Sequence, residues 1–288
     1  MGAQTPPSML MYYGRKAYAS LSSRVRARSY LRRHPQRTDF RSPDWDALWQ
    51  QVRRRYPALA TQEYRVDPAR YGQWVADAQY PFMSYVVNRA EKYLEHQVSI
   101  DLLELPESGL VVDVAAGRSW FAQILRRRGY RVIAQDQAFA TGLDGERLGG
   151  DACDMELPAA CVDGITLHCS FEHFEGDSDS RFVAEAARVL RPGRRAVILP
   201  LYLHHEFINL TDPLYSKEPV QFDEGAATIA SFGLANRYGR HYGLDAFGAR
   251  VVEPALRHGM QVRAVRILGG TQVDPGVYLN FALVLTKR

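Results

Sequence analysis

The feature that most constrains the fold is a regular alternation of apolar runs with helix-like segments, which begins near residue 110. Continuous apolar runs of about this length are typical of strands buried on both faces of a sheet. Helices of about ten residues separate them, and two of these helices end at Gly129 and at Pro192-Gly193. The order predicts right-handed βαβ units and an α/β fold with a mostly parallel sheet. The apolar runs are GLVVDVAAG (109–117), RVIAQD (131–136), VDGITLHCS (162–170) and RRAVILPLYL (194–203).

The alternation and the residues before it divide the chain into three regions. A basic arm covers 1–41, a helical cap rich in aromatic residues covers 42–105, and the α/β domain covers 106–288 with an insertion at about 201–240. Residues 1–41 hold nine Arg or Lys and one acid, so their net charge is +8. Because the whole chain has a net charge of +4, the remaining 247 residues have a net charge of −4. The arm would suit an anionic membrane surface, a nucleic acid or an acidic partner. Packing on its own domain or on a second subunit of a homodimer is the favoured alternative.

Length and composition exclude several other classes. No apolar run reaches the roughly 18 residues that a transmembrane helix needs, and no secretory signal is evident. The three cysteines form no CxxC pair, which argues against a disulfide framework and a zinc ribbon. We therefore expect a cytoplasmic protein.

Small residues follow the first strand in DVAAGRS (113–119), so a ligand can approach the backbone there. Such a turn suits a dinucleotide or S-adenosylmethionine. Asp113 favours the second, since a carboxylate repels a pyrophosphate but attracts a cationic methionine group. Asp136 closes the next strand, where an acid hydrogen-bonds ribose hydroxyls, and Asp151 follows the third strand.

Jointly and in this order, the motifs between Val111 and Pro200 resemble class I S-adenosylmethionine-dependent methyltransferases of the group called type 11. The resemblance implies a Rossmann-like, seven-stranded sheet whose last strand is antiparallel. It also implies that S-adenosylmethionine is the cofactor. The residues it implies for cofactor binding are Asp113, Ala115 and Gly117 at the methionine, Asp136 at the ribose, Asp151 and Ala152 at the adenine, and His168 or Cys169 near the sulfonium. Ala115 and Ser119 replace two usual glycines, and we expect alanine to be tolerated if its φ is negative.

His173 is the first candidate for a general base, because it follows the fourth strand at the edge where ligands bind in such folds. Glu172 and His205 are further catalytic candidates. With a histidine, Glu172, Glu175 and Asp177 could also bind Mg²⁺ or Mn²⁺. The start of the next helix explains Asp177 without any ligand, so a metal is not favoured.

The stretch LHCSFEHFEGD (167–177), with the His-, Tyr- and Arg-rich segments of the insertion, is similar to bacterial methyltransferases that modify glycans or polysaccharides. This resemblance implies an O-methyltransferase that acts on a hydroxyl of a sugar or polysaccharide precursor, and we expect His173 to be the base. A small aromatic or quinone-like acceptor is one alternative. A nucleic-acid methyltransferase that uses the basic arm is the other, and it is less favoured because the rest of the chain is acidic.

Overall fold

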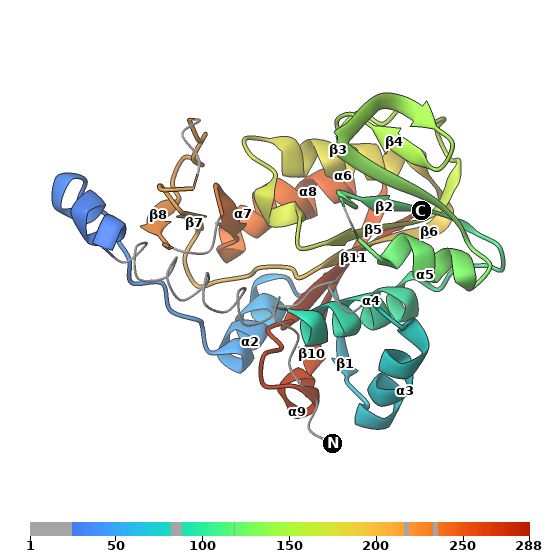
Figure 1. Cartoon of the computed structure of the whole chain (residues 1–288), viewed down its shortest axis with the longest axis horizontal. Helices are drawn as coiled ribbons and strands as arrows, with labels where there is room; N and C mark the ends of the chain where they lie inside the picture. The colour runs from blue at the N-terminus through green and yellow to red at the C-terminus, as the bar shows by residue number, and fades with distance from the viewer. Residues whose placement is uncertain (1–24, 82–87, 118, 216–218, 233–235) are drawn as a thin grey trace, which may run out of the picture.

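The computed structural model describes residues 25–81, 88–117, 119–215, 219–232 and 236–288. Its centre is an eight-stranded sheet with the order β1-β10-β11-β6-β5-β2-β3-β4 (Figure 1). Strand β11 is antiparallel to both of its neighbours, and the other pairs are parallel. The mostly parallel α/β fold with an antiparallel last strand is therefore confirmed. The strands are β1 (Ala60–Arg65), β2 (Leu110–Val114), β3 (Arg131–Asp144), β4 (Arg147–Gly149), β5 (Val162–His168), β6 (Leu190–Leu199), β10 (Met260–Leu268) and β11 (Phe281–Lys287).

The sheet has eight strands rather than the expected seven, because β1 pairs in parallel with β10 at the edge. Alternate residues of β1 are exposed, so its sequence ATQEYR lacks the apolar run of a central strand. The segment 42–105, which we predicted as a helical cap, thus contributes a strand to the main sheet as well as helices.

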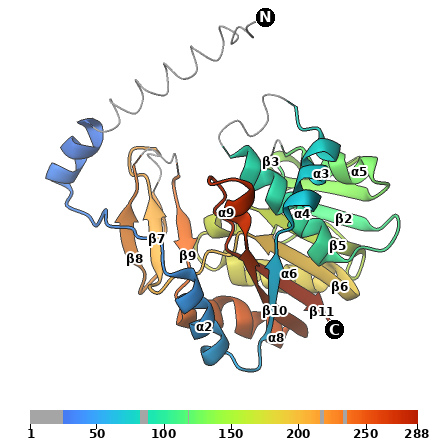
Figure 2. The same cartoon turned by 90° about the horizontal axis from the view of Figure 1, so that it is seen from below.

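Helices cover both faces of the sheet, as Figures 1 and 2 show. Apolar residues of α2 (Trp45–Arg55), α6 (Ser178–Val189) and α8 (Glu253–Arg257) pack in one core cluster. On the other face, α4 (Arg89–Leu103) packs on β6, β10 and β11, while α5 (Phe121–Arg127) packs on β2 and β3. Helix α3 (Pro68–Ala78) lies against α4 through Trp74 and Tyr93. Short segments complete the chain: η1 (Phe171–His173), α7 (Leu244–Phe247), the π-helical turn η2 (Gly248–Val252) and α9 (Gly270–Val273).

The predicted insertion forms a small sheet of its own beside the main one, with the order β8-β7-β9 (Figure 2). Its strands are β7 (Ile208–Thr211), β8 (Ala227–Ala230) and β9 (Gly239–His241). Arg240 fixes this sheet to the α/β domain: its buried guanidinium pairs with Asp223 at 2.8 Å and with Asp179 of α6 at 2.8 Å. It also donates to the carbonyl oxygens of Phe174 and Gly176, which follow β5.

Part of the predicted basic arm lies outside the described residues. Residues 25–33 are helical, while residues 1–24 belong to the undescribed part. Arg37 of the arm pairs with Glu206 at 3.0 Å and bridges to Ile229 of β8, so this part of the arm packs on the insertion. Within the described residues, no helix combines the length and apolar character needed to cross a membrane.

Candidate functional site

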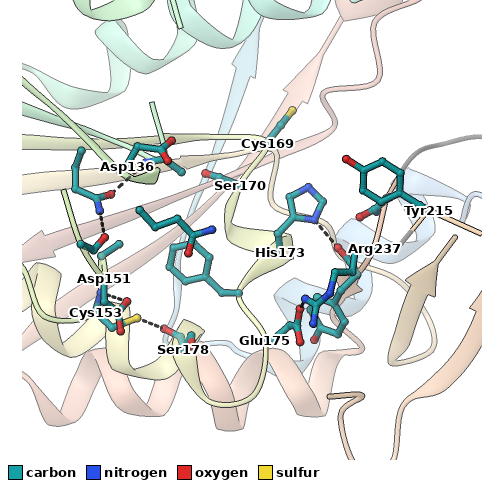
Figure 3. Close-up of a pocket in the computed structure, with 18 residues that line it drawn as sticks. Asp136, Asp151, Cys153, Cys169, Ser170, His173, Glu175, Ser178, Tyr215 and Arg237 are labelled. Carbon is teal, nitrogen blue, oxygen red and sulfur yellow. Dashed lines mark hydrogen bonds and ion pairs between the residues drawn. The ribbon is translucent and has the colours of Figure 1, made fainter. Parts of the chain in front are cut away.

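A cavity of about 630 Å³ lies at the carboxyl ends of β2, β4 and β5 and beside the middle of β3 (Figure 3). Strand β3 continues to Asp144, so Asp136 lies within this strand and does not close it as predicted. Its volume is in the range of small-molecule sites, and its position is the ligand-binding edge of an open α/β sheet. The predicted residues Ala115, Asp136, Asp151, Ala152 and His173 all line it. Side chains from the insertion and its flanks close the opposite side: Tyr215, Asn236, Arg237 and Tyr238. We call this the first cavity.

Asp136 joins the first two sequence motifs. Its Oδ2 accepts a hydrogen bond from the backbone N–H of Gly117 at 2.7 Å, and its Oδ1 accepts one from Ala138 N–H at 2.8 Å. Gly117 has φ of +50°, a conformation that glycine adopts without strain. These bonds fix the carboxylate at the rim of the cavity, where its remaining lone pairs can accept from a ribose diol.

Ala115 differs from our expectation, because its φ is +52° rather than negative. Its Cβ therefore sits in a left-handed conformation that glycine would take at lower cost. Cys169, at the end of the neighbouring strand β5, has φ of +49°. Both strands thus turn sharply where they reach the cavity, and strained backbone of this kind is common at binding sites.

Asp151 is held by the loop after β4. Its Oδ1 accepts from Cys153 N–H at 2.9 Å, and its Oδ2 pairs with Arg181 at 3.2 Å. Burial opposes ionisation, but these bonds lower the pKa of Asp151. Burial and the adjacent Asp151 raise the pKa of the Cys153 thiol to about 12, so Cys153 stays neutral.

Asp113 and His168 lie just behind the first cavity. Asp113 Oδ1 accepts from Thr166 Oγ1 at 3.0 Å and lies 3.5 Å from His168 Nδ1, while His168 Nε2 is 2.7 Å from Ser99 Oγ of α4. Asp113 Oδ2 is buried and has no hydrogen-bond partner among the described residues. The lining residues of the first cavity include neither of these two side chains, so the structure does not place Asp113 or His168 in the cavity as the resemblance implied.

His173 lies in η1 with its ring in the first cavity (Figure 3), and its side chain is 46% exposed. Its Nδ1 is hydrogen-bonded to the carbonyl oxygen of Tyr238. A carbonyl can only accept, so Nδ1 carries the proton, and the neutral ring presents the lone pair of Nε2. Nε2 is 3.6 Å from Glu172 Oε1.

Glu172 lines a second cavity, of about 350 Å³, and not the cavity that His173 lines. The second cavity lies beyond the end of β6 and the start of β11. The carboxyl group is buried, and this burial raises its pKa. Its Oε2 has no hydrogen-bond partner in the described part of the chain. Consecutive residues of one turn therefore line two cavities.

A row of buried polar residues on α4, which was not predicted from the sequence, lies near the ends of the strands. Lys92 pairs with Glu95 at 2.6 Å, and Glu95 Oε1 accepts from the Cys169 thiol at 3.1 Å. Glu91 Oε2 accepts from the backbone N–H of Tyr278 at 2.8 Å. In sequence, polar residues at helical spacing look like a solvent-facing stripe, and only their burial under the strand ends reveals them.

The other predicted residues lie outside the first cavity or are held by the insertion. Glu175 lines the cavity, but it pairs with Arg237 and accepts from Gln221 N–H. Asp177 is exposed and precedes α6, as the helix-start explanation predicted, although its side chain caps no N–H. His205 is exposed and outside both cavities, 3.4 Å from Gln51. In the described residues, no three His, Cys, Asp or Glu side chains are grouped so as to hold a metal ion.

The model of the family described as "Methyltransferase domain" matches residues 112–198, which run from β2 to β6 and supply most of the first cavity's strand ends. Together with the fold and the site, this match defines the class of protein: the chain contains a class I S-adenosylmethionine-dependent methyltransferase domain. S-adenosylmethionine is its cofactor. Comparison with curated proteins found no significant match.

Several solved structures are similar to this chain. One is the Burkholderia thailandensis 1,6-didemethyltoxoflavin-N1-methyltransferase with bound 1,6-didemethyltoxoflavin and S-adenosylhomocysteine (16% identity, 77% of this chain, 91% of that chain, TM-score 0.44). An S-adenosylmethionine-dependent methyltransferase from Mesorhizobium loti gives 16% identity over 67% of this chain and 96% of that chain, with a TM-score of 0.44. A protein from Anabaena variabilis, described as a methyltransferase from an antibiotic biosynthesis pathway, gives 23% identity and a TM-score of 0.31. That match covers 36% of this chain and 43% of the Anabaena chain.

The residues present fit the cofactor. The first cavity is large enough for a nucleoside with an amino-acid tail, and its carboxylates suit hydroxyl and amino donors. Asp113 lies behind this cavity on β2, the strand to which the resemblance assigns the methionine group, and its Oδ2 is buried with no hydrogen-bond partner among the described residues. A negative charge there stabilises a nearby sulfonium or ammonium.

Proposed function

We propose that the protein transfers the methyl group to a hydroxyl oxygen and that His173 is the general base. The observation that carries this proposal is the hydrogen bond from His173 Nδ1 to Tyr238 O, which leaves Nε2 as a proton acceptor in the first cavity. When bound, S-adenosylmethionine supplies an electrophilic methyl group. The chain's own residues orient the acceptor, and His173 Nε2 takes the hydroxyl proton as the new O–C bond forms.

Two classes of acceptor are candidates for this hydroxyl, and the first is a sugar or polysaccharide precursor. Polar side chains on the insertion side of the first cavity support this class, because a saccharide needs a hydrogen-bond partner for many hydroxyls. Tyr215, Asn236 and Arg237 are the groups concerned. A small aromatic acceptor is the second candidate, and the second cavity favours it.

Transfer of a labelled methyl group from S-adenosylmethionine to saccharides, phenols and RNA, with and without a chelator, tests the proposal. His173→Ala should bind the cofactor with unchanged affinity and lose about 10²- to 10⁴-fold in turnover. His258→Ala, which changes an exposed histidine far from both cavities, is the matched control. Unchanged turnover in His173→Ala would remove His173 as base, and transfer to nitrogen or carbon alone would overturn the hydroxyl acceptor.

A further inference from the structure

The second cavity is built differently from the first. Its walls come from the residues after β6, the start of β11 and the chain before α2. Aromatic rings form much of the wall: Trp45 and Phe281 meet edge to face at 6.1 Å, and Tyr202 lies 4.8 Å from His241. Leu201 and Leu203 add aliphatic surface.

Charge is nearly absent from this wall. Among the described residues that line it, there is no Lys or Arg, and Glu172 is the only acid. Burial, with a contribution from His204, lowers the pKa of His241 to about 3, so this ring is neutral. An acceptor that carries a phosphate or carboxylate would find no cation to pair with, and burying an unpaired charge is costly.

Several of the cavity's polar groups already have partners. The Asn280 amide donates to Tyr278 O at 2.9 Å and accepts from Arg266 at 3.2 Å. The Tyr278 hydroxyl is 3.6 Å from Cys169 Sγ. By contrast, Glu172 Oε2 is buried and unpaired among the described residues. A ligand with one hydroxyl satisfies this carboxyl group, whereas a saccharide would leave most of its hydroxyls without partners.

The two cavities adjoin at η1, which carries Glu172 and His173. Asn236 lines both of them, and Glu172 in one is 3.6 Å from His173 Nε2 in the other. A hydroxyl bound beside Glu172 would therefore lie near the proposed base.

We propose that the second cavity binds the methyl acceptor, and that the acceptor is a small, uncharged aromatic hydroxyl compound whose hydroxyl lies between Glu172 and His173. This inference rests on the proposed function and chooses between its two acceptor classes. In the reaction, the phenolic O–H bond breaks and its proton goes to His173 Nε2. The oxygen forms a bond to the methyl carbon as the C–S bond breaks, giving an aryl methyl ether and S-adenosylhomocysteine. Glu172 binds the acceptor as a protonated carboxyl group that donates a hydrogen bond to the acceptor oxygen, which leaves the phenolic proton directed to His173 Nε2. Burial, which raises the pKa of Glu172, favours this form.

Methyl transfer is measured with 2-naphthol, with the anionic 4-hydroxybenzoate and with methyl glucoside. We expect kcat/KM for 2-naphthol to exceed that for each of the other two at least tenfold. Calorimetry with 2-naphthol and S-adenosylhomocysteine-loaded protein gives binding independently of turnover. Preference for methyl glucoside would overturn this inference and leave the proposed function standing, and absence of 2-naphthol binding would also overturn it.

Cavity variants locate the site. Trp45→Ala and Leu203→Trp should each raise KM for 2-naphthol at least fivefold, with cofactor affinity unchanged. Glu172→Ala should lower kcat about tenfold or more while cofactor binding and unfolding midpoint are preserved, whereas Glu172→Gln, whose amide keeps a donor, should retain kcat. Phe222→Ala removes an exposed aromatic ring outside both cavities and should change neither constant. If KM for 2-naphthol is the same in both cavity variants as in the unchanged protein, the acceptor binds elsewhere.

Discussion

The backbone N–H of Gly117 and the Oδ2 atom of Asp136, 2.7 Å apart, join the loop after β2 to strand β3 at the rim of the first cavity. This bond orders both groups before a cofactor arrives, so little conformational entropy is lost on binding. The first-motif turn and the ribose carboxylate therefore behave as one unit.

Asp136→Ala should weaken binding of S-adenosylmethionine, because it removes both the proposed ribose acceptor and the anchor of Gly117. Loss of hydrogen bonds to a charged group costs about 1.5–3 kcal/mol, or roughly 10- to 100-fold in Kd. Calorimetric titration measures this. Asp144→Ala, on an exposed part of the same strand, should leave Kd unchanged. Equal affinities in the two variants would remove Asp136 from the cofactor site.

Ala115→Gly should keep or increase stability, because φ of +52° is costly for alanine. Relief of left-handed strain, reduced by the greater entropy of unfolded glycine, predicts a gain of up to about 1 kcal/mol. Urea unfolding checks it. Ala116→Gly, at the next position where φ is not positive, should lose stability. A loss at 115 as large as that at 116 would contradict the strained conformation.

Glu91 should make stability fall as pH rises. Burial first, and then the nearby Glu95, raise the pKa of Glu91 from 4.5 to about 8, although its bonds from Tyr278 and Leu279 N–H oppose the shift. Between these values the folded state binds more protons than the unfolded state, so this contribution is complete below pH 4.5 and is lost through pH 8. Its slope is at most about 1.4 kcal/mol per pH unit.

Glu91→Gln should flatten that dependence, because an amide does not titrate in this range. Urea unfolding at several pH values between 5 and 8 measures it, and Glu107→Gln at an exposed position is the control. The same slope in Glu91→Gln and the unchanged protein would show that Glu91 is ionised in the folded state.

Arg240→Met should strongly destabilise the protein. It leaves the carboxylates of Asp223 and Asp179 buried without this partner, and breaking a buried ion pair costs about 3–5 kcal/mol. Thermal unfolding measures the change, and Arg54→Met on the exposed face of α2 should shift stability by no more than about 0.5 kcal/mol. A small effect of Arg240→Met would mean that the insertion is held mainly by other contacts.

The central strands were predictable from sequence because strands buried on both faces are continuous apolar runs, as in Val111–Val114 and Ile165–Leu167. Strand β1 was not, since an edge strand with one exposed face reads like a loop. The three strands of the insertion have only three or four residues each, too few for a periodic pattern.

Some residues of the site were likewise predictable from sequence motifs, and others were not. The motif-bearing residues Ala115, Asp136 and Asp151 reach one cavity because the topology brings parallel strand ends to one edge. The partner that sets the tautomer of His173 is Tyr238, 65 residues later, and it depends on how the insertion docks. No local pattern contains that information. The burial of Glu91 and Glu95 on α4 likewise follows from what the helix packs against.

The most direct test of the account is the rate of methyl transfer to a hydroxyl acceptor in a single turnover with saturating labelled S-adenosylmethionine, compared between the unchanged protein and His173→Ala. We predict an O-methylated product, a fall in rate of about 10²- to 10⁴-fold in the variant, and the same cofactor Kd in both. Equal single-turnover rates, or a product methylated only at nitrogen or carbon, would contradict the account.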